Sequence, residues 1–197
     1  MNKDWTGNSL SVYKNLGASN HTETDREKND YYATDPKALD ALYKSFVIPD
    51  NIWECACGEG HLSKKLQEYG INVYSSDLID RGFGDGNVDF LLQNKMPDGC
   101  KNILTNPPYK YATEFVEHAL NLLDDGCYCI MFLKTTFLEG QKRYDRIFKN
   151  NPPKYVSQFV KRVECGLNGH FNGGSAVAYA WFIWKKGFKG HTQIDWI

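Results

Sequence analysis

The sequence predicts one α/β domain in which a mostly parallel, doubly wound sheet carries helices on both faces and ends in a β-hairpin. Short apolar stretches alternate with amphipathic helical stretches, as the crossover units of a parallel sheet require. One apolar stretch runs into the glycines of "ECACGEG", and a later one runs into "TNPPY". The chain has 197 residues, which suffices for one sizeable domain with a real core.

The N-terminal part begins with a polar stretch over residues 1–30, which we expect to be a loosely ordered arm preceding a single domain. "DPKALDALYKSF" (35–46) predicts an amphipathic helix with an aspartate cap and a proline in its first turn. "NIWECACGEG" (51–60) predicts a short buried strand that ends in glycines. "HLSKKLQEYG" (61–70) predicts a helix stopped by glycine, and "INVYSSD" (71–77) predicts a second strand.

The middle of the chain continues this alternation after a glycine-rich loop. "VDFLL" (88–92) is a short piece to which we assign no element type, and "KNILTN" (101–106) predicts a clear third strand. "ATEFVEHALNLLDDG" (112–126) predicts a helix that ends at glycine, and "CYCIMFL" (127–133) predicts a strand. These elements are the repeating units of a doubly wound sheet.

The C-terminal part predicts one more helix and two strands. "LEGQKRYDRIFKNN" (138–151) indicates the helix, and "KYVSQFV" (154–160) the next strand. "AVAYAWFIWKK" (176–186) predicts the last and longest strand. Because only the glycine-bearing loop 165–175 separates these two strands, we expect a terminal hairpin.

Two acidic residues, Glu54 and Glu59, accompany Gly58 and Gly60 in the loop after the first strand. A pyrophosphate needs an uncluttered helix N-terminus, so these carboxylates disfavour a dinucleotide. They suit a ligand with cationic groups and hydroxyls. S-adenosylmethionine (SAM) carries a sulfonium, an ammonium and a ribose diol, and no phosphate. We therefore expect SAM as cofactor, with His61 beside it.

Two further acidic positions fit the same ligand. Asp77 ends the second strand, where a carboxylate is placed to hold ribose hydroxyls. Asp89 and Phe90 follow as an acceptor for an adenine amino group beside an aromatic ring. The alternative is that the glycines serve tight turns and the acids merely cap loops.

The tripeptide Asn-Pro-Pro occurs twice, and the two copies have different contexts. Asn106–Pro108 follows an apolar run and so stands at the carboxyl end of a strand, where ligands of α/β sheets bind. Asn151–Pro153 follows the polar tail of a helix, where such residues are ordinary punctuation. In the first copy, the Asn106 amide oxygen and the Pro107 carbonyl can accept both hydrogens of an amino group, and Tyr109 can stack on a planar base. We expect chemistry at the first copy alone.

At these residues the sequence resembles the amino-methyltransferases of DNA, especially the N6-adenine type of small phage and restriction-modification enzymes. The resemblance covers roughly residues 28–186 and rests on "DYYATDP", "ECACGEG" and "TNPPY". It implies a Rossmann-like SAM-dependent methyltransferase fold and an extruded target base. The implied catalytic residues are Asn106, Pro107, Pro108 and Tyr109. The implied cofactor-binding residues are Tyr31, Tyr32, Thr34, Glu54, Ala56, Cys57, Gly58, Gly60, His61, Asp77, Leu78, Asp89 and Phe90.

The chain departs from that family in one respect. Members with stringent site choice often add a separate target-recognition domain, and only about 90 residues follow Tyr109 here, most of them needed for the sheet. We expect residues 31–197 to form a single domain without such an addition. Site choice is then short, loose or supplied by a separate specificity subunit.

The net charge of −1 hides an asymmetry that bears on the partner. Residues 134–197 hold 11 Lys+Arg and 4 Asp+Glu, whereas residues 1–133 hold 12 and 20. A basic C-terminal third is typical of nucleic-acid binding, although a solvated lysine-rich surface gives the same count. The expected DNA-contacting residues are Lys134, Lys142, Arg143, Arg146, Lys161 and Arg162.

The composition excludes other classes. No apolar run is long enough to span a membrane, and no signal core precedes the domain, so we expect a cytoplasmic protein without membrane contact. The six cysteines are expected to be free thiols, and no spacing indicates a metal site. Adenine N6 of DNA is the preferred target. Cytosine N4, RNA (guanine N2 or adenine N6), protein glutamine and a catalytically silent nucleic-acid-binding module remain open.

Overall fold

The computed structural model describes residues 32–163, 165–167 and 177–197. The predicted N-terminal arm and most of the loop before the last predicted strand lie outside these residues. The strands are β1 (Tyr32–Thr34), β2 (Ile52–Glu54), β3 (Val73–Ser75), β4 (Asn102–Thr105), β5 (Tyr128–Lys134), β6 (Tyr155–Gln158), β7 (Cys165–Leu167), β8 (Tyr179–Lys185) and β9 (Gln193–Trp196). The helices are α2 (Lys37–Ser45), α3 (His61–Glu68), α4 (Ala112–Leu122) and α5 (Gln141–Arg143), with a π-helical turn η5 (Tyr144–Phe148) and 3₁₀ turns η2 (Phe90–Leu92), η3 (Tyr109–Tyr111) and η4 (Thr135–Leu138).

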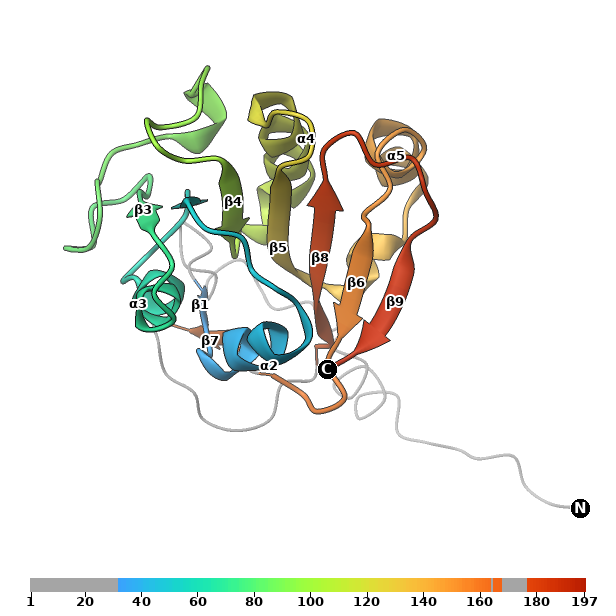
Figure 1. Ribbon diagram of the computed structural model, residues 1–197, viewed down its shortest axis with the longest axis horizontal. Helices are drawn as coiled ribbons and strands as arrows, with labels where there is room; N and C mark the ends of the chain where they lie inside the picture. Colours follow the sequence, from blue (N-terminus) through green and yellow to red (C-terminus); the bar gives the residue numbers. More distant parts are fainter. Residues whose placement is uncertain (1–31, 164, 168–176) are drawn as a thin grey trace, which may run out of the picture.

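Seven strands form one sheet in the order β3-β2-β4-β5-β8-β6-β9 (Figure 1). Strands β3, β2, β4 and β5 pair in parallel, and β6 pairs in parallel with β9. Strand β8 runs antiparallel to both of its neighbours, β5 and β6. The prediction of a mostly parallel α/β sheet is confirmed. We call the end of the sheet where β2, β3, β4, β5 and β6 finish the carboxyl edge.

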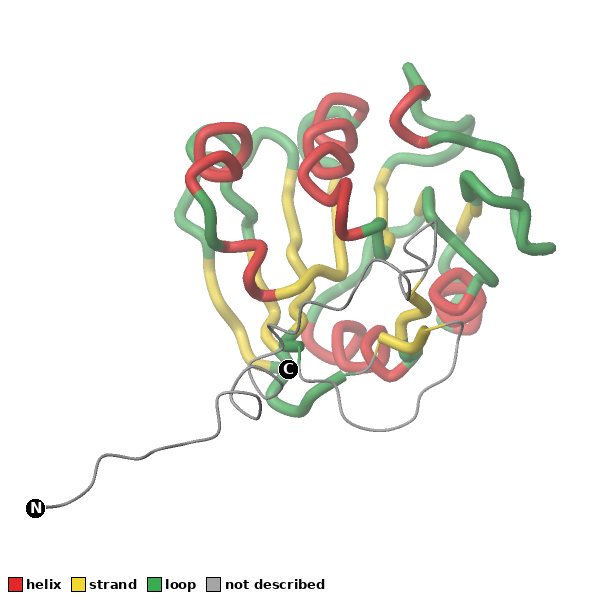
Figure 2. Tube along the Cα trace, turned by 180° about the vertical axis from the view of Figure 1, so that it is seen from behind, coloured by secondary structure: helices red, strands yellow, loops and turns green. Residues whose placement is uncertain are grey.

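Helices cover both faces of this sheet, as predicted (Figures 1 and 2). Strands β5 and β8 are buried on both sides and send alternate side chains to two cores. Met131 and Phe182 pack with α4 and η5, whereas Phe132 and Trp181 pack with α2 and α3. The continuous apolar run of each strand therefore serves two layers of helices.

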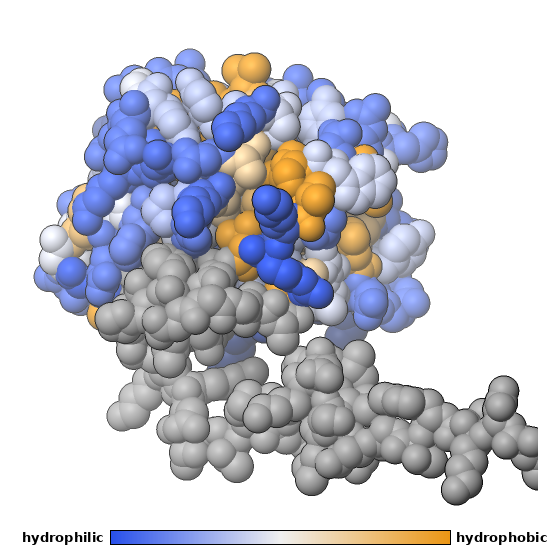
Figure 3. Space-filling model, turned by 90° about the horizontal axis from the view of Figure 1, so that it is seen from below, coloured by the Kyte–Doolittle hydropathy of each residue, from blue (hydrophilic) through white to orange (hydrophobic). Residues whose placement is uncertain are grey.

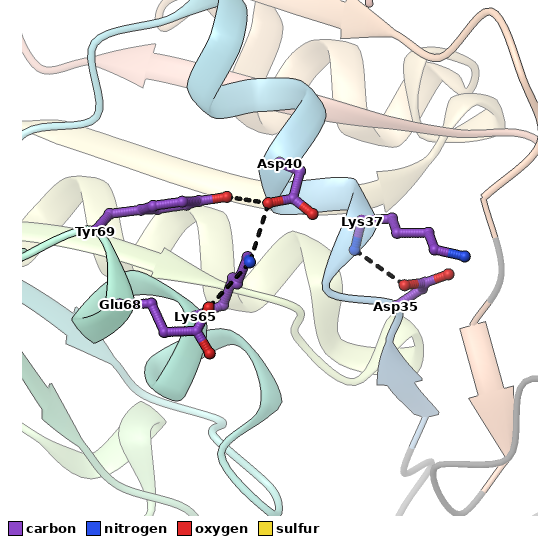
Figure 4. Close-up of polar contacts among 6 residues, drawn as sticks. All are labelled: Asp35, Lys37, Asp40, Lys65, Glu68 and Tyr69. Atoms are coloured by element: carbon purple, nitrogen blue, oxygen red, sulfur yellow. Dashed lines mark hydrogen bonds and ion pairs between the residues drawn. The ribbon is translucent and has the colours of Figure 1, made fainter.

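Helices α2 and α3 lie side by side and are joined by polar contacts (Figure 4). The Lys65 ammonium is 3.2 Å from the Asp40 carboxylate and 3.0 Å from that of Glu68, and the Tyr69 hydroxyl donates to Asp40. The hydrogen bond from Tyr69, followed by that from Lys65, lowers the pKa of Asp40. At the start of α2, Asp35 accepts the Lys37 backbone N–H at 2.9 Å, which is the expected capping contact.

Three local predictions differ from the structure. The helix expected over 138–151 is only the short α5 continued by the π-helical turn, because Gly140 adopts φ +113° and Lys149 N–H bonds to the carbonyl of Tyr144, five residues back. The short piece at 88–92, to which the sequence assigned no element type, contains the 3₁₀ turn η2.

The expected terminal hairpin is also incomplete. Strands β6 and β8 do pair antiparallel, but the chain between them contains β7, which pairs with β1 in a separate two-stranded sheet. Strand β8 is neither last nor uniquely long: β9 follows it, and β5 has the same seven residues. Polar and apolar residues alternate over 193–196, but the segment has only four residues and all are exposed, so the sequence did not predict a strand there.

Candidate active site

The sheet order creates a switch point between β2 and β4. The chain passes from β2 outward to β3 and then returns to β4 on the other side of β2. In register, Glu54 of β2 lies beside Ser75 of β3, and Trp53 lies beside Ile103 of β4. The loops that follow these strands therefore meet at the carboxyl edge, which is where open α/β sheets bind ligands.

The glycine loop between β2 and α3 is closed by its own hydrogen bonds. Gly58 and Gly60 take φ +56° and +80°, which glycine adopts without strain. The Gly58 N–H donates to Asp77 Oδ2 at 2.8 Å, and the Cys57 N–H donates to the Ser76 carbonyl at 3.0 Å. The Gly60 N–H turns back to the Cys57 carbonyl. Three of the donors that a phosphate would need are thus already in use.

Glu54 differs from the expectation that its carboxylate faces a cationic ligand. It is 2% exposed, and its carboxyl group accepts from both the hydroxyl and the backbone N–H of Ser63, in the first turn of α3. The Ser63 hydroxyl is also 2.6 Å from that of Ser75. Burial raises the pKa of Glu54 to about 8, so the group is mainly protonated at neutral pH. Glu54 joins β2, β3 and α3 beneath the loop.

The other predicted acids hold loops in place. Asp77 accepts the Ile79 N–H at 2.9 Å with the oxygen that Gly58 does not use. Asp89 accepts the Leu91 N–H at 3.0 Å and so caps η2. A carboxylate has about four acceptor positions, so both side chains retain capacity for ligand hydroxyl or amino groups. Glu59 stands on the surface, 3.5 Å from His61 Nε2.

Phe90 does not offer an open aromatic face. It is 2% exposed, with its ring centroid 5.1 Å from that of Trp53 and 4.8 Å from that of Phe115. The ring completes the core beside α4, and a place for Phe90 beside an adenine remains a prediction. Leu78, by contrast, is 53% exposed next to Asp77.

Phe83 is an aromatic residue of the site that the sequence reasoning missed. Its ring lies so close to Gly60 that a Cβ atom there would overlap it. Its carbonyl oxygen accepts the Cys57 thiol at 3.5 Å, and the Lys64 ammonium lies 4.9 Å from its ring centroid. The available signal was its position as the single aromatic residue of the glycine-rich loop 82–86.

The N-terminal segment reaches the same region. Tyr31 lies outside the described residues, and Tyr32 is described by its backbone, which pairs with Leu167. Thr34 ends β1, which lies against α3, and is 2% exposed. Its hydroxyl has no hydrogen-bond partner within the described ranges, which is costly for a buried polar atom. A ligand hydroxyl or amino group would satisfy it.

The first Asn-Pro-Pro copy lies at the carboxyl edge, as predicted. Asn106 directly follows β4 and is half-buried, and Pro107 is buried. Pro108 begins the turn η3, where its carbonyl accepts the Tyr111 N–H at 2.9 Å. The two prolines have fixed φ angles and restrict the backbone of Asn106, which limits how the Pro107 carbonyl can move relative to the strand.

Tyr109 forms an aromatic wall beside them. Its ring centroid lies 5.9 Å from that of Tyr179 at the start of β8, and Tyr179 stacks on Phe132 at 5.0 Å. The Lys134 ammonium, at the end of β5, is 4.9 Å from the Tyr109 ring centroid. A positive charge and an aromatic surface therefore adjoin the same motif.

The second copy lies at the opposite edge of the sheet, before β6. The Asn151 N–H donates to the Ile147 carbonyl at 2.8 Å, and the Asn151 carbonyl accepts the Trp184 indole N–H at 3.1 Å. Asn151 lines a shallow polar pocket with Arg146 and Lys186, away from the glycine loop. This is the helix terminus that the sequence context indicated.

The predicted DNA-contacting residues do not all remain available. Arg146 pairs with Glu114 at 3.1 Å and with Glu117, and Arg143 donates to the carbonyls of Phe137, Thr136 and Glu139. Both guanidinium groups are committed to the fold, so we withdraw them from the predicted set. Lys134 ends β5 and Lys161 and Arg162 follow β6, all at the carboxyl edge, and Lys142 is exposed on α5.

Much of the positive charge of the C-terminal third lies elsewhere. Five lysines precede β6, end β8 or follow β8 at the opposite edge: Lys149, Lys154, Lys185, Lys186 and Lys189. The charge asymmetry of the sequence therefore does not map to a single face, and the charge count alone does not locate a nucleic-acid surface.

The described part of the chain also bears on the predictions about cysteines, metal sites and membrane spans. Cys55, Cys57, Cys100, Cys127 and Cys129 are free thiols, as expected. Across residues 32–163, 165–167 and 177–197, no group of histidine, cysteine or acidic side chains is arranged to hold a metal ion. No helix in these ranges has the length and apolar character of a membrane span.

Comparison with known proteins identifies the fold. The sequence matches no protein-family model and no curated protein. A solved structure assigned as a class I SAM-dependent methyltransferase from Listeria monocytogenes matches 95% of this chain and 70% of its own, with 14% identity and a TM-score of 0.58. A protein assigned as a hemolysin from Lactococcus lactis matches 81% and 91%, with 11% identity and a TM-score of 0.59.

A third similar structure contains a bound cofactor. Magnesium protoporphyrin IX methyltransferase from Synechocystis, solved with SAM, matches 90% of this chain and 91% of its own, with 12% identity and a TM-score of 0.51. At these identities the similarity concerns the fold. The chain has the Rossmann-like α/β fold found in SAM-dependent methyltransferases.

Proposed function

We propose, from this fold as premise, that the chain is a SAM-dependent methyltransferase acting on an exocyclic amino nitrogen, namely N6 of adenine in DNA. The observation that carries the proposal is the meeting of two loops at the switch point. The glycine loop follows β2, and Asn106–Tyr109 follows the neighbouring strand β4. Cofactor and target would thus lie on adjacent strand ends.

The donor set of the glycine loop favours SAM over a dinucleotide. The Gly58 N–H is bonded to Asp77, and the Glu54 carboxyl group takes the Ser63 N–H at the start of α3. The helix terminus is therefore already capped by the protein, which leaves little for a phosphate. Asp77, Asp89 and the buried Thr34 hydroxyl remain as acceptors for ribose, adenine and ammonium groups. When bound, SAM would supply an electrophilic methyl group on sulfur.

The chemistry at Asn106 needs no strong base. The amino nitrogen of adenine is a poor nucleophile because its lone pair is delocalised into the ring. Acceptance of both amino hydrogens by the Asn106 amide oxygen and the Pro107 carbonyl would localise that lone pair and direct it at the methyl carbon. A carbon–nitrogen bond forms, the carbon–sulfur bond breaks, and one amino proton leaves to solvent. Positioning and electrostatics supply the catalysis.

DNA is the preferred target because the surroundings of Asn106 suit an extruded base. Tyr109 offers a ring face, and Lys134 places a positive charge next to it. Extrusion costs a few kcal/mol, which base stacking and phosphate contacts offset. The resemblance of "TNPPY" and "ECACGEG" to the N6-adenine enzymes of phage and restriction systems supports the same choice.

The deciding experiment is transfer of a tritiated methyl group to duplex DNA, total RNA and protein in parallel, followed by nucleoside mass spectrometry. We expect label in N6-methyladenine of DNA. Label confined to protein, or to methylguanosine of RNA, would replace the proposed target with that class. Calorimetric titration with SAM and with NAD tests the cofactor separately: binding of NAD alone would refute the cofactor assignment.

The two Asn-Pro-Pro copies provide a matched pair of variants. Asn106→Ala should reduce methyl transfer by at least a hundredfold while SAM affinity stays within about twofold, because only the amino-group acceptor is removed. Asn151→Ala should leave the rate within a few-fold, since its described contacts are made by the backbone. Similar losses in both variants, with both folded by circular dichroism, would contradict the assignment.

A further inference from the structure

The carboxyl edge carries an exposed apolar pair at the corner formed by β6 and β9. Val160 is 71% exposed and Trp196 is 70% exposed. The two are neighbours, because the Val160 N–H donates to the carbonyl of Ile197 at 2.8 Å. A tryptophan side chain that is this exposed contributes little to the hydrophobic core, so a contribution to stability does not explain why Trp196 stands at the surface.

Basic side chains adjoin this pair. Lys161 and Arg162 follow Val160 and are exposed, and Lys161 forms no ion pair within the described residues. Asp195 is the acid next to Trp196 in sequence, but it alternates with Trp196 along β9 and so points to the other face. We call Val160, Lys161, Arg162 and Trp196 the β6–β9 corner.

The side of the molecule toward which β6 and β9 run has a mixed surface. Figure 3 presents the molecule from below, the side toward which β6 and β9 run in Figure 1, and hydrophobic and hydrophilic groups interleave there. Apolar surface flanked by basic side chains matches a nucleic-acid backbone, which presents deoxyribose faces between phosphates.

We propose that the β6–β9 corner binds the sugar–phosphate backbone of the DNA duplex flanking the extruded base, with Trp196 and Val160 against deoxyribose and Lys161 against phosphate. This inference rests on the proposed function. Four strand spacings separate β4 from β9 in the sheet. At about 4.8 Å each they span about 19 Å, which corresponds to five or six base pairs of 3.4 Å on one side of the target.

A second copy of the chain fits this corner less well. A stable dimer buries about 800 Å² on each partner, far more than two side chains provide. A symmetric pairing would also bring Lys161 and Arg162 of both copies together, and like charges in contact oppose association. DNA therefore provides favourable contacts for both the apolar and the basic residues of the corner, whereas a second copy provides them for the apolar residues alone.

The test compares steady-state methylation of duplexes by wild-type protein, Trp196→Ala and Lys161→Ala. We expect KM for DNA to rise about tenfold in Trp196→Ala, with kcat within twofold, because ground-state contacts alone are lost. Lys161→Ala should reduce the salt dependence of binding by about one ion. The controls are Val47→Ala and Lys101→Ala, which alter exposed residues at the opposite edge and should leave both quantities unchanged.

Duplex length gives a second readout that a merely structural role would not move. In wild-type protein, KM should rise when one flank is shortened from ten to four base pairs, and Trp196→Ala should abolish that rise. Equal KM values and equal length dependence in wild type and Trp196→Ala would overturn the inference while leaving the methylation of DNA intact. Sedimentation that shows a wild-type dimer and a monomeric Trp196→Ala variant would also overturn the inference.

Failure of the proposed function is distinguishable from failure of this inference. Wild-type protein that methylates no DNA contradicts the function. Fluorescence anisotropy of labelled duplex then tests the corner by binding alone, and unchanged affinity in Trp196→Ala would refute the corner as well. Thermal unfolding of each variant verifies that the comparison is made between folded proteins.

Discussion

The buried carboxyl group of Glu54 makes a quantitative prediction about stability and pH. Its folded pKa is raised to about 8 from an ordinary value of 4.5, because burial disfavours the charged form. Between these two values the folded chain binds one more proton than the unfolded chain. The free energy of unfolding must therefore fall as pH rises, by about 1.4 kcal/mol per pH unit.

Replacement of Glu54 by glutamine should remove this dependence. A glutamine amide is neutral at every pH, can accept the Ser63 N–H and can donate to the Ser63 hydroxyl. From pH 5 to pH 7.5 the contribution of Glu54 amounts to about 3 kcal/mol. We expect Glu54→Gln to have wild-type stability near pH 5 and to exceed it by about 3 kcal/mol at pH 7.5.

Urea unfolding at pH 5, 6, 7 and 7.5 measures this difference, and subtraction of the two proteins cancels the contributions of all other titrating groups. Glu139→Gln is the control, because Glu139 is an exposed glutamate outside the glycine loop. Parallel stability curves for wild type and Glu54→Gln across this range would refute the reasoning. They would mean that Glu54 is ionised in the folded chain at neutral pH.

Two further predictions concern the loop and the surface. Gly60→Ala should destabilise the fold by more than Gly70→Ala in urea unfolding, because both residues have positive φ but only the new Cβ at Gly60 overlaps Phe83. We expect the backbone strain common to both variants to cost about 1–3 kcal/mol. Equal losses of stability would mean that the Phe83 ring moves freely. Arg146→Gln should lower stability by about 1 kcal/mol or less, because Arg146 is paired with Glu117. For the same reason, DNA affinity and its salt dependence should stay unchanged. A weaker salt dependence in the variant would return Arg146 to the set of DNA-contacting residues.

The sheet was predictable because its strands and helices are marked by strong local patterns. Strand β4 is buried over its whole length, β5 and β8 are apolar up to their terminal lysines, and α2 and α3 have caps or glycine stops at the expected places. Strand β9 was not predictable, because its four residues are all exposed and its only support is pairing with β6. Pairing partners distant in sequence leave no local periodicity to detect.

The positions of the site residues were more predictable than their environments. Strand ends follow from the alternation of elements, so Glu54, Asp77 and Asn106 were correctly expected at one edge. Burial depends on what packs above a residue, and nothing local indicates that α3 covers Glu54 or that α4 covers Phe90. Charge pairing has the same limitation: Arg146 meets glutamates of α4 that lie about thirty residues earlier.

The antiparallel strand β8 lies inside the sheet, between β5 and β6, although both neighbours precede it in the chain. During synthesis, β5 and β6 leave the ribosome first, with a gap one strand wide between them. Until residues 179–185 emerge, the apolar edge of β5 stays unpaired, and both cores lack the large side chains of β8, including Trp181, Phe182 and Trp184. Co-translational folding should therefore stall at this gap, and a nascent chain halted before β8 should depend on chaperones to stay soluble.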